Sequence, residues 1–233
     1  GAFGFADGPG ADARFNFPVG VALDAQGRLL VTDQSNQRIR LVTSEGVTTT
    51  LGGADGPRIE GKPAGIVIAR DGTVFVTTVA QAHRILTLSP DGTVATLAGS
   101  AEYGVADGRG EVARFRHPMD IAEGPDGQLY VAEAGYSKIR RIDREGNVST
   151  VAGRSWRAGE TVESIDGDVA VARFHGPCAI AVASDGTIYV GEQNGQCVRR
   201  IREGVVSTLC QCEDDVGGMV LDEPSGLLYV AAG

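Results

Sequence analysis

The sequence predicts an all-β protein, a β-propeller built from antiparallel blades of four strands each. Three observations carry this prediction. The sequence repeats itself with a period of about fifty residues, apolar residues alternate with polar ones within each copy, and Asp-Gly or Gly turns separate the short apolar segments. A repeat of this length that divides into four short strands is typical of a propeller blade.

The repeat occurs four times, and a fifth copy begins near the end of the chain. The first copy starts at Phe5 and returns at Val105, with a shorter copy from Lys62 between them and a fourth from Ala172. The fifth starts at Gly217. We therefore expect one propeller domain over residues 1–233, with blades at 1–53, 54–100, 101–154 and 155–211, and a partial blade at 212–233.

Each copy begins its first strand at a proline and then reads as three further strands. The first strand is innermost in a propeller, so its start lies at the mouth of the central channel. The Asp-Gly pairs that follow the first and third strands are hairpin signals. The prolines are Pro18, Pro63, Pro118 and Pro177.

The residues that carry the pattern are ARF-x-x-P-x-G, DG-x-(I/L)-Y-V-A-(D/E), R-I-R and V-S-T-x-A-G. They resemble the NHL repeat, and the resemblance covers essentially the whole chain. It implies a propeller of six blades when complete, of which this chain holds four and half of a fifth, as a segment of a longer protein. Related propellers include interaction scaffolds, RNA-binding tripartite-motif proteins, sensor domains of bacterial kinases and lyases, so the fold does not select an activity.

Composition narrows the classes of partner. Thirty acidic residues against 21 basic ones give a net charge of −9. Such a field repels a phosphate backbone, so we expect no nucleic-acid partner. The apolar stretches are interrupted after a few residues, far short of the roughly 20 that a membrane span requires, so we expect no membrane insertion.

Acidic residues and arginines recur at fixed spacing in the long loops and after the second strands. A binding site needs one constellation, whereas a pair present in three blades is a structural device. We expect these pairs to tie the loops to neighbouring blades. The expected pairs join Asp7, Asp107 and Asp166 to Arg14, Arg114 and Arg173, and Asp33, Glu133 and Glu192 to Arg40, Arg140 and Arg199.

Three residues break the repeat near the expected channel mouth. His117 stands where the first copy has Phe17, His175 stands where it has Asn16, and Asp120 replaces a glycine or alanine. Two imidazoles and a carboxylate would suit zinc or another transition metal, and the peptidyl-hydroxyglycine lyase propeller uses channel histidines in this way. The favoured interpretation is a wet, polar channel without cofactor, and His117 and His175 are the candidate ligands if a metal binds.

One aromatic insertion marks a candidate contact surface. Trp156 lies in the long loop before the fourth blade, between Arg154 and Arg157. Tryptophan and arginine together are typical of binding hot spots. The alternative is a tryptophan that folds back over the edge of a blade.

The cysteines predict a disulfide. If residues 203–204 form a two-residue hairpin, counting outward places Cys197 opposite Cys210, on a rung where side chains approach closely. Cys178 and Cys212 form a possible second pair. A disulfide favours an extracellular or secretory compartment, whereas four free thiols are typical of a cytosolic protein.

The sequence thus favours a non-enzymatic interaction or scaffold module within a larger multidomain protein. The long loops before three of the blades emerge on one face and form a platform for protein partners, neighbouring domains or glycans. The alternative is a metal-assisted lyase or hydrolase, and it depends on His117, His175 and Asp120 at the channel mouth.

Overall fold

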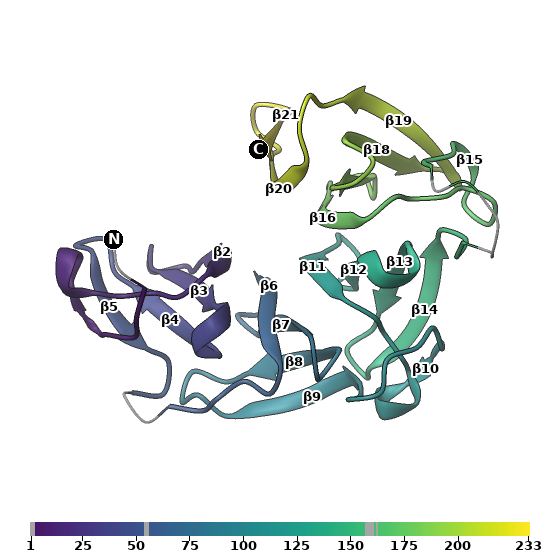
Figure 1. The fold of residues 1–233 in the computed structure, drawn as a ribbon. Coiled ribbons are helices and arrows are strands. Elements are labelled where there is room, and N and C mark those ends of the chain that lie inside the picture. The colour runs from purple at the N-terminus through teal and green to yellow at the C-terminus, as the bar shows by residue number, and fades with distance from the viewer. Residues whose placement is uncertain (1–2, 54–55, 157–160, 162) are drawn as a thin grey trace.

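A computed structural model describes residues 3–53, 56–156, 161 and 163–233 of the chain. It confirms an all-β propeller in which successive sheets lie side by side around a common axis (Figure 1). Three of the four full sheets have five strands instead of the four expected, because a two-residue strand from the preceding loop pairs with the outermost strand. Arg157 lies outside the described residues.

The first two sheets cover the first two copies of the repeat. The first has the order β1-β5-β4-β3-β2 and consists of β1 (Gly8–Pro9), β2 (Pro18–Leu23), β3 (Leu29–Asp33), β4 (Arg38–Val42) and β5 (Val47–Thr50). The second has the order β6-β7-β8-β9 and consists of β6 (Lys62–Ile68), β7 (Val74–Val79), β8 (Arg84–Leu88) and β9 (Val94–Gly99).

The third and fourth sheets repeat the order of the first, and the fifth has two strands. The third consists of β10 (Gly108–Arg109), β11 (Pro118–Glu123), β12 (Leu129–Glu133), β13 (Lys138–Ile142) and β14 (Asn147–Ala152). The fourth consists of β15 (Gly167–Asp168), β16 (Pro177–Val182), β17 (Ile188–Glu192), β18 (Cys197–Arg202) and β19 (Val205–Gln211). The fifth consists of β20 (Val216–Asp222) and β21 (Leu227–Ala232).

The helical elements are single 3₁₀ turns. Among the described residues, none of them has the length or the apolar character needed to cross a bilayer. Those after the second strands end at a residue in the left-handed conformation, which turns the chain into the third strand. The four are η1 (Gly10–Asp12), η2 (Gln34–Asn36), η3 (Gly110–Val112) and η4 (Ala134–Tyr136).

Apolar side chains fill the spaces between neighbouring blades. Phe115, Ile121 and Leu129 of the third blade pack with Phe75 and Ile85 of the second blade, and each side chain is at most 3% exposed. Close-packed layers of this kind hold one blade against the next, because each sheet face is covered by its neighbour.

A buried arginine links two carboxylates within each five-stranded blade. The Nη1 atom of Arg140 lies 2.7 Å from Oε2 of Glu133, and its Nη2 atom lies 2.7 Å from Oδ1 of Asp107. The Arg140 guanidinium is fully buried and stacks on Phe115, with 4.9 Å between its Cζ atom and the ring centroid. The other two blades repeat the triad with Arg40, Asp33 and Asp7, and with Arg199, Glu192 and Asp166.

The expected partners of the loop aspartates were therefore wrong. Asp7 binds Arg40 of β4 and not Arg14, whose guanidinium donates to the carbonyl oxygens of Ala11 and Ala13. The triad also ties each long loop to its own blade and not to a neighbour. Arginines recur at both spacings, so the sequence pattern did not distinguish the two partners.

The predicted disulfide between Cys197 and Cys210 is wrong. The hairpin turn lies at 203–204 as expected, and the register runs as counted until a bulge between Val198 and Arg199 shifts it by one residue. Cys197 therefore faces Gln211, and Cys210 faces Val198. Since side chains alternate along a strand, this shift moves the two sulfurs to opposite faces.

Cys178 and Cys212, the possible second pair, also carry free thiols. Equivalent bulges interrupt the third and fourth strands of the second and third blades, so the shift is a feature of the repeat. The preference for an oxidising compartment rested on the bridge and loses its basis with it.

Candidate functional site

One rim of the propeller carries a continuous row of aromatic and cationic side chains. They come from segments that adjoin the starts of β11 and β16, and they span the junction between the third and fourth blades. We call this row the aromatic rim. It consists of Tyr103, Arg116, Tyr136, Trp156 and Arg173.

Arg116 occupies the centre of one half of the rim. Its Cζ atom lies 5.4 Å from the ring centroid of Tyr103 and 5.7 Å from that of Tyr136, within the range of cation–π attraction. Its side chain packs on the backbone of Gly135, where a Cβ atom would lie 2.4 Å from Cγ of Arg116. The 3₁₀ turn η4 therefore needs glycine at this position to accept the arginine.

The buried triad of the third blade positions Arg116. The backbone N–H of Arg116 donates a 3.0 Å hydrogen bond to Oε1 of Glu133, and Oε2 of the same carboxylate binds Arg140. Burial raises the pKa of Glu133 above its ordinary value, and the neighbouring Arg140 opposes that shift. The structural device repeated in the blades thus fixes the backbone on which the rim is built.

The other half of the rim is centred on Trp156. Its indole Nε1–H donates a 3.1 Å hydrogen bond to Oγ of Ser137, and the guanidinium of Arg173 lies 5.2 Å from its ring. His175 meets the indole edge-on, with 6.3 Å between ring centroids. Trp156 is half-buried, so part of its side chain packs against the fold and part stays on the surface.

Ser155 joins the two halves, because its hydroxyl donates to the carbonyl oxygen of Tyr136 at 3.4 Å. Arg154, another predicted contact residue, is half-buried, and its backbone N–H donates to the carbonyl oxygen of Ala172 at 3.0 Å. The rim therefore runs without interruption from the third blade to the fourth.

Two histidines lie beside Arg116. The rings of His83 and His117 are 5.4 Å apart, and the backbone N–H of His117 donates to Nδ1 of His83 at 3.3 Å. Burial lowers the pKa of both imidazoles, and the charge of Arg116 lowers each further. Both histidines are therefore held in the neutral form near pH 7, and Arg116 is the fixed charge of this half of the rim.

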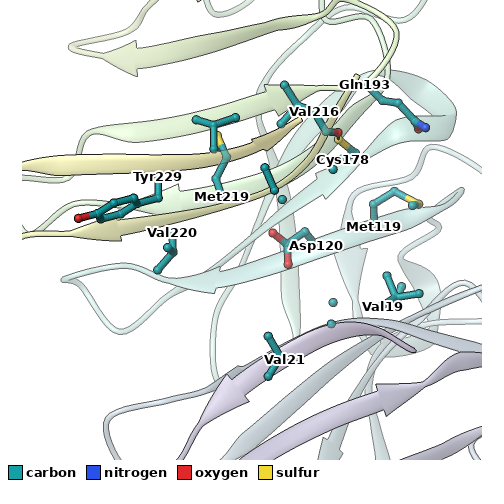
Figure 2. A pocket seen from close by; sticks show the side chains of 17 residues that line it. Val19, Val21, Met119, Asp120, Cys178, Gln193, Val216, Met219, Val220 and Tyr229 are labelled. Atoms are coloured by element: carbon teal, nitrogen blue, oxygen red, sulfur yellow. Dashed lines mark hydrogen bonds between the residues drawn. The ribbon is translucent and has the colours of Figure 1, made fainter. Parts of the chain in front are cut away.

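The central channel forms a separate feature, a cavity of about 500 Å³ between β2, β11 and the two-stranded sheet. Asp120 points into it between Met219 and Val21, as Figure 2 shows. The Asp120 carboxylate accepts 2.9 Å hydrogen bonds from the backbone N–H groups of Ile121 and Ile180. Burial raises the pKa of Asp120 to about 6, although these hydrogen bonds oppose the shift.

A polar side chain near the axis bridges each successive pair of blades. Thr32 donates to the carbonyl oxygen of Ala64 at 2.8 Å, and Thr77 donates to that of Met119 at 3.3 Å.

In the third blade, alanine replaces the threonine, and the Asp120 carboxylate makes the link to Ile180 instead. In the fourth blade, the thiol of Cys178 donates to the carbonyl oxygen of Val216 at 2.8 Å. Asp120 and Cys178 thus take over the bridging role of the threonines.

The structure does not unite the three residues considered for a metal. His117 pairs with His83, His175 lies against Trp156, and Asp120 lies in the channel among backbone donors. Within the described ranges, no group of three or more His, Cys, Asp or Glu residues is placed to hold a metal ion.

Sequence reasoning missed Arg116, Tyr136 and Tyr103. The signal was present, because the first copy of the repeat carries Asn16 and Asn36 at the positions of Arg116 and Tyr136. These substitutions are far apart along the chain and become a cluster only once the blade is folded.

Comparisons with known proteins match the fold described above. The NHL repeat profile matches residues 15–40. Teneurin-m of Drosophila melanogaster is 26% identical over 83% of this chain and 8% of its own length. Protein SUPPRESSOR OF QUENCHING 1, chloroplastic, of Arabidopsis thaliana is 27% identical over all of this chain and 25% of its own length. The chain thus spans a quarter or less of these curated relatives.

Solved structures resemble the chain in fold. The nidogen/laminin complex has a TM-score of 0.69 at 17% identity, over 95% of this chain and 74% of the matched chain. A putative gluconolactonase has 0.67 at 16% identity, over 98% and 74%. Streptogramin B lyase has 0.64 at 18% identity, over 96% and 64%. The profile match thus marks residues 15–40 as similar to an NHL repeat, and the repeated sheets together with these likenesses identify the fold of the chain as a β-propeller.

Proposed function

We propose that the chain is a non-enzymatic interaction module that binds a protein partner through the aromatic rim. The observation that carries the proposal is the clamp of Arg116 between Tyr103 and Tyr136, which continues to Trp156. Tryptophan, tyrosine and arginine are the residues most enriched among binding hot spots. Their convergence on one rim of a rigid scaffold supports a contact surface for another protein.

Two residues of the rim, Arg116 and Tyr136, also depart from the repeat, whereas the triads follow it. A residue that recurs from blade to blade has a structural role in the blade. A residue found in a single blade is available for a contact with a partner. Arg116 and Tyr136 are of the second kind, since the first blade has Asn16 and Asn36 there. Asn36 instead binds the carbonyl oxygen of Gly4, a contact within its own blade.

The proposal includes a larger protein around this chain. Leu29 of the first blade is 38% exposed, whereas Leu129 at the same position of the third blade is fully buried by the preceding blade. Val21 is 60% exposed, and its counterpart Ile121 is 3% exposed. A further blade against the first would cover this face, as each preceding blade does elsewhere.

A metal-assisted lyase or hydrolase is the alternative function. The likeness to streptogramin B lyase and to a putative gluconolactonase is a likeness of fold. Because His117 and His175 contact different neighbours, the residues first considered for such a site give this alternative less support than the rim gives to protein binding.

Site-specific photo-crosslinking in cells tests the proposal. A photoreactive phenylalanine analogue replaces Tyr136 on the rim or, as a matched control, Val205, which is 51% exposed in the outer hairpin of the fourth blade. We expect discrete crosslinked protein species from position 136 and none of these species from position 205. Identical crosslinking from both positions, or none from position 136, would contradict the proposal.

A further inference from the structure

We propose that the clamp formed by Tyr103, Arg116 and Tyr136 binds a carboxylate side chain in an acidic peptide segment of the partner. This inference rests on the proposed function and adds the chemistry of the partner. It follows from an unpaired guanidinium, from the packing that holds this guanidinium in place, and from the single cation that the clamp offers.

Arg116 differs from the triad arginines in its lack of a carboxylate partner. Arg140 binds both Glu133 and Asp107, whereas within the described residues Arg116 forms no ion pair and donates no hydrogen bond from its guanidinium. The nearby Glu102 pairs instead with Arg114, at 3.5 Å. The planar edge of the Arg116 guanidinium therefore remains available to a carboxylate, which it can bind through two parallel N–H···O bonds.

The clamp holds this guanidinium in place before any partner arrives. Tyr103 and Tyr136 lie against it, Gly135 admits its aliphatic stem, and Glu133 fixes its backbone N–H. A long side chain that is already ordered loses less conformational entropy when it binds. Stacking on aromatic rings with a free hydrogen-bonding edge also favours arginine over lysine at this position.

The number of cations in the clamp favours a single carboxylate over a nucleic-acid backbone. The net charge is −9, and the arginines of the triads are occupied by carboxylates within the fold. Nucleic-acid backbones are bound by several cations in a row. The clamp instead offers one fixed cation, because His83 and His117 are held neutral near pH 7. The Arg116 guanidinium can therefore bind one carboxylate of the partner, while the tyrosines contact small or apolar residues beside it.

Trp156 provides the measurement, because it is the one tryptophan of the chain and its indole hydrogen-bonds Ser137, next to Tyr136. Its fluorescence is followed during titration with an acetylated and amidated peptide of alternating Glu and Gly. Two further probes are the same peptide with Gln in place of each Glu, and a single-stranded oligonucleotide. We expect saturable binding of the acidic peptide and at least about tenfold weaker binding of the other two.

Three variants locate the binding. Arg116→Gln is expected to weaken the acidic peptide about tenfold or more, and Arg116→Lys to weaken it less, because lysine keeps the charge and loses the planar fork. Arg202→Gln is the matched control, since Arg202 is an exposed arginine in the outer hairpin of the fourth blade, and it should leave the affinity unchanged.

Equal binding of the acidic and amide peptides, or an unchanged affinity of Arg116→Gln, would overturn the inference. Tighter binding of the oligonucleotide would replace it with a nucleic-acid site. Failure of the inference is distinguishable from failure of the proposed function. Crosslinks from position 136 that survive Arg116→Gln would retain the interaction surface and reject the carboxylate clamp.

Discussion

The carboxylate of Asp120 accepts a 2.9 Å hydrogen bond from the backbone N–H of Ile180 and so links the third blade to the fourth. The burial of this carboxyl group makes the stability of the propeller depend on pH, and its two backbone hydrogen bonds oppose the effect. Burial raises the pKa of Asp120 from its ordinary value of 3.8 to about 6. Neutral Asp120 therefore stabilises the folded state fully below about pH 4. This stabilisation is lost as the pH rises through about 6, because the buried group then becomes charged.

Chemical denaturation of the wild type and of Asp120→Asn across pH 4–7 checks this expectation. The free energy of unfolding of the wild type should fall relative to the variant by as much as about 3 kcal/mol over that range. Asp126→Asn, in the exposed turn between β11 and β12, is the control and should follow the wild type. Parallel curves for the wild type and Asp120→Asn would exclude a titration of Asp120 in this range.

The buried triad predicts a large loss of stability when one member is removed. Arg140→Met leaves the fully buried carboxylate of Glu133 without its cation. We expect a loss of about 3–5 kcal/mol in the free energy of unfolding, measured by urea denaturation. Arg109→Met should cost less than about 0.5 kcal/mol, because Arg109 is exposed and its side chain contacts a backbone carbonyl. Similar losses for both variants would contradict the structural role of the triad.

The free thiols predict a graded reactivity. Cys210 is exposed, whereas burial raises the pKa of Cys178 and of Cys197 to about 12, which leaves little thiolate at either position. Iodoacetamide should therefore modify Cys210 first in the native protein, and all four cysteines should react after unfolding without reductant. Mass spectrometry checks the order. A cysteine that resists alkylation in the unfolded, unreduced chain would reveal a disulfide.

Two leucines at the same position of the repeat test whether another part of the protein covers the face of the first blade that carries Leu29. Leu129→Ala should cost about 2–5 kcal/mol, because Leu129 is fully buried. Leu29→Ala should cost about 1 kcal/mol or less in the 233-residue chain, because Leu29 is 38% exposed. Equal costs in this chain would show that the face is already covered. If a further blade covers it in a larger protein, the two costs should converge there.

The fold was predictable from the sequence because each signal was local and was repeated. The turn at Asp185-Gly186 needs an aspartate whose Oδ1 accepts the N–H of Thr187 and a glycine with a φ of 83°, and both residues stand in the sequence. The turn at 203–204 uses its glycine in the same way, because Gly204 has a φ of 78°. Apolar alternation then fixed which face of each strand is buried.

The site was less predictable because its contacts join distant segments. No residue in β18 or β19 marks the bulge that separates Cys197 from Cys210. The bulge becomes visible only in the pairing register of the two strands. The partner of His117 is His83, from the preceding blade, and no spacing motif links the two. Asp120 takes the place of a threonine bridge, and this role becomes visible only by comparison with the neighbouring blades.

The central claim is that partner binding resides in the positions where the third blade departs from the repeat. A triple variant, Tyr103→Phe, Arg116→Asn and Tyr136→Asn, gives the third blade the residues that the first blade carries as Phe3, Asn16 and Asn36. Since the first blade folds with these residues and keeps its triad, the variant should keep its triad as well.

The most direct measurement is the affinity of this variant for the protein captured by crosslinking from position 136. Titration is carried out with the purified partner and is accompanied by thermal unfolding of the variant. We predict a melting temperature within about 4 °C of the wild type and a loss of affinity of at least about a hundredfold, because two hot-spot side chains, Arg116 and Tyr136, are removed together and Tyr103 loses its hydroxyl. Wild-type affinity in the folded variant would contradict the account.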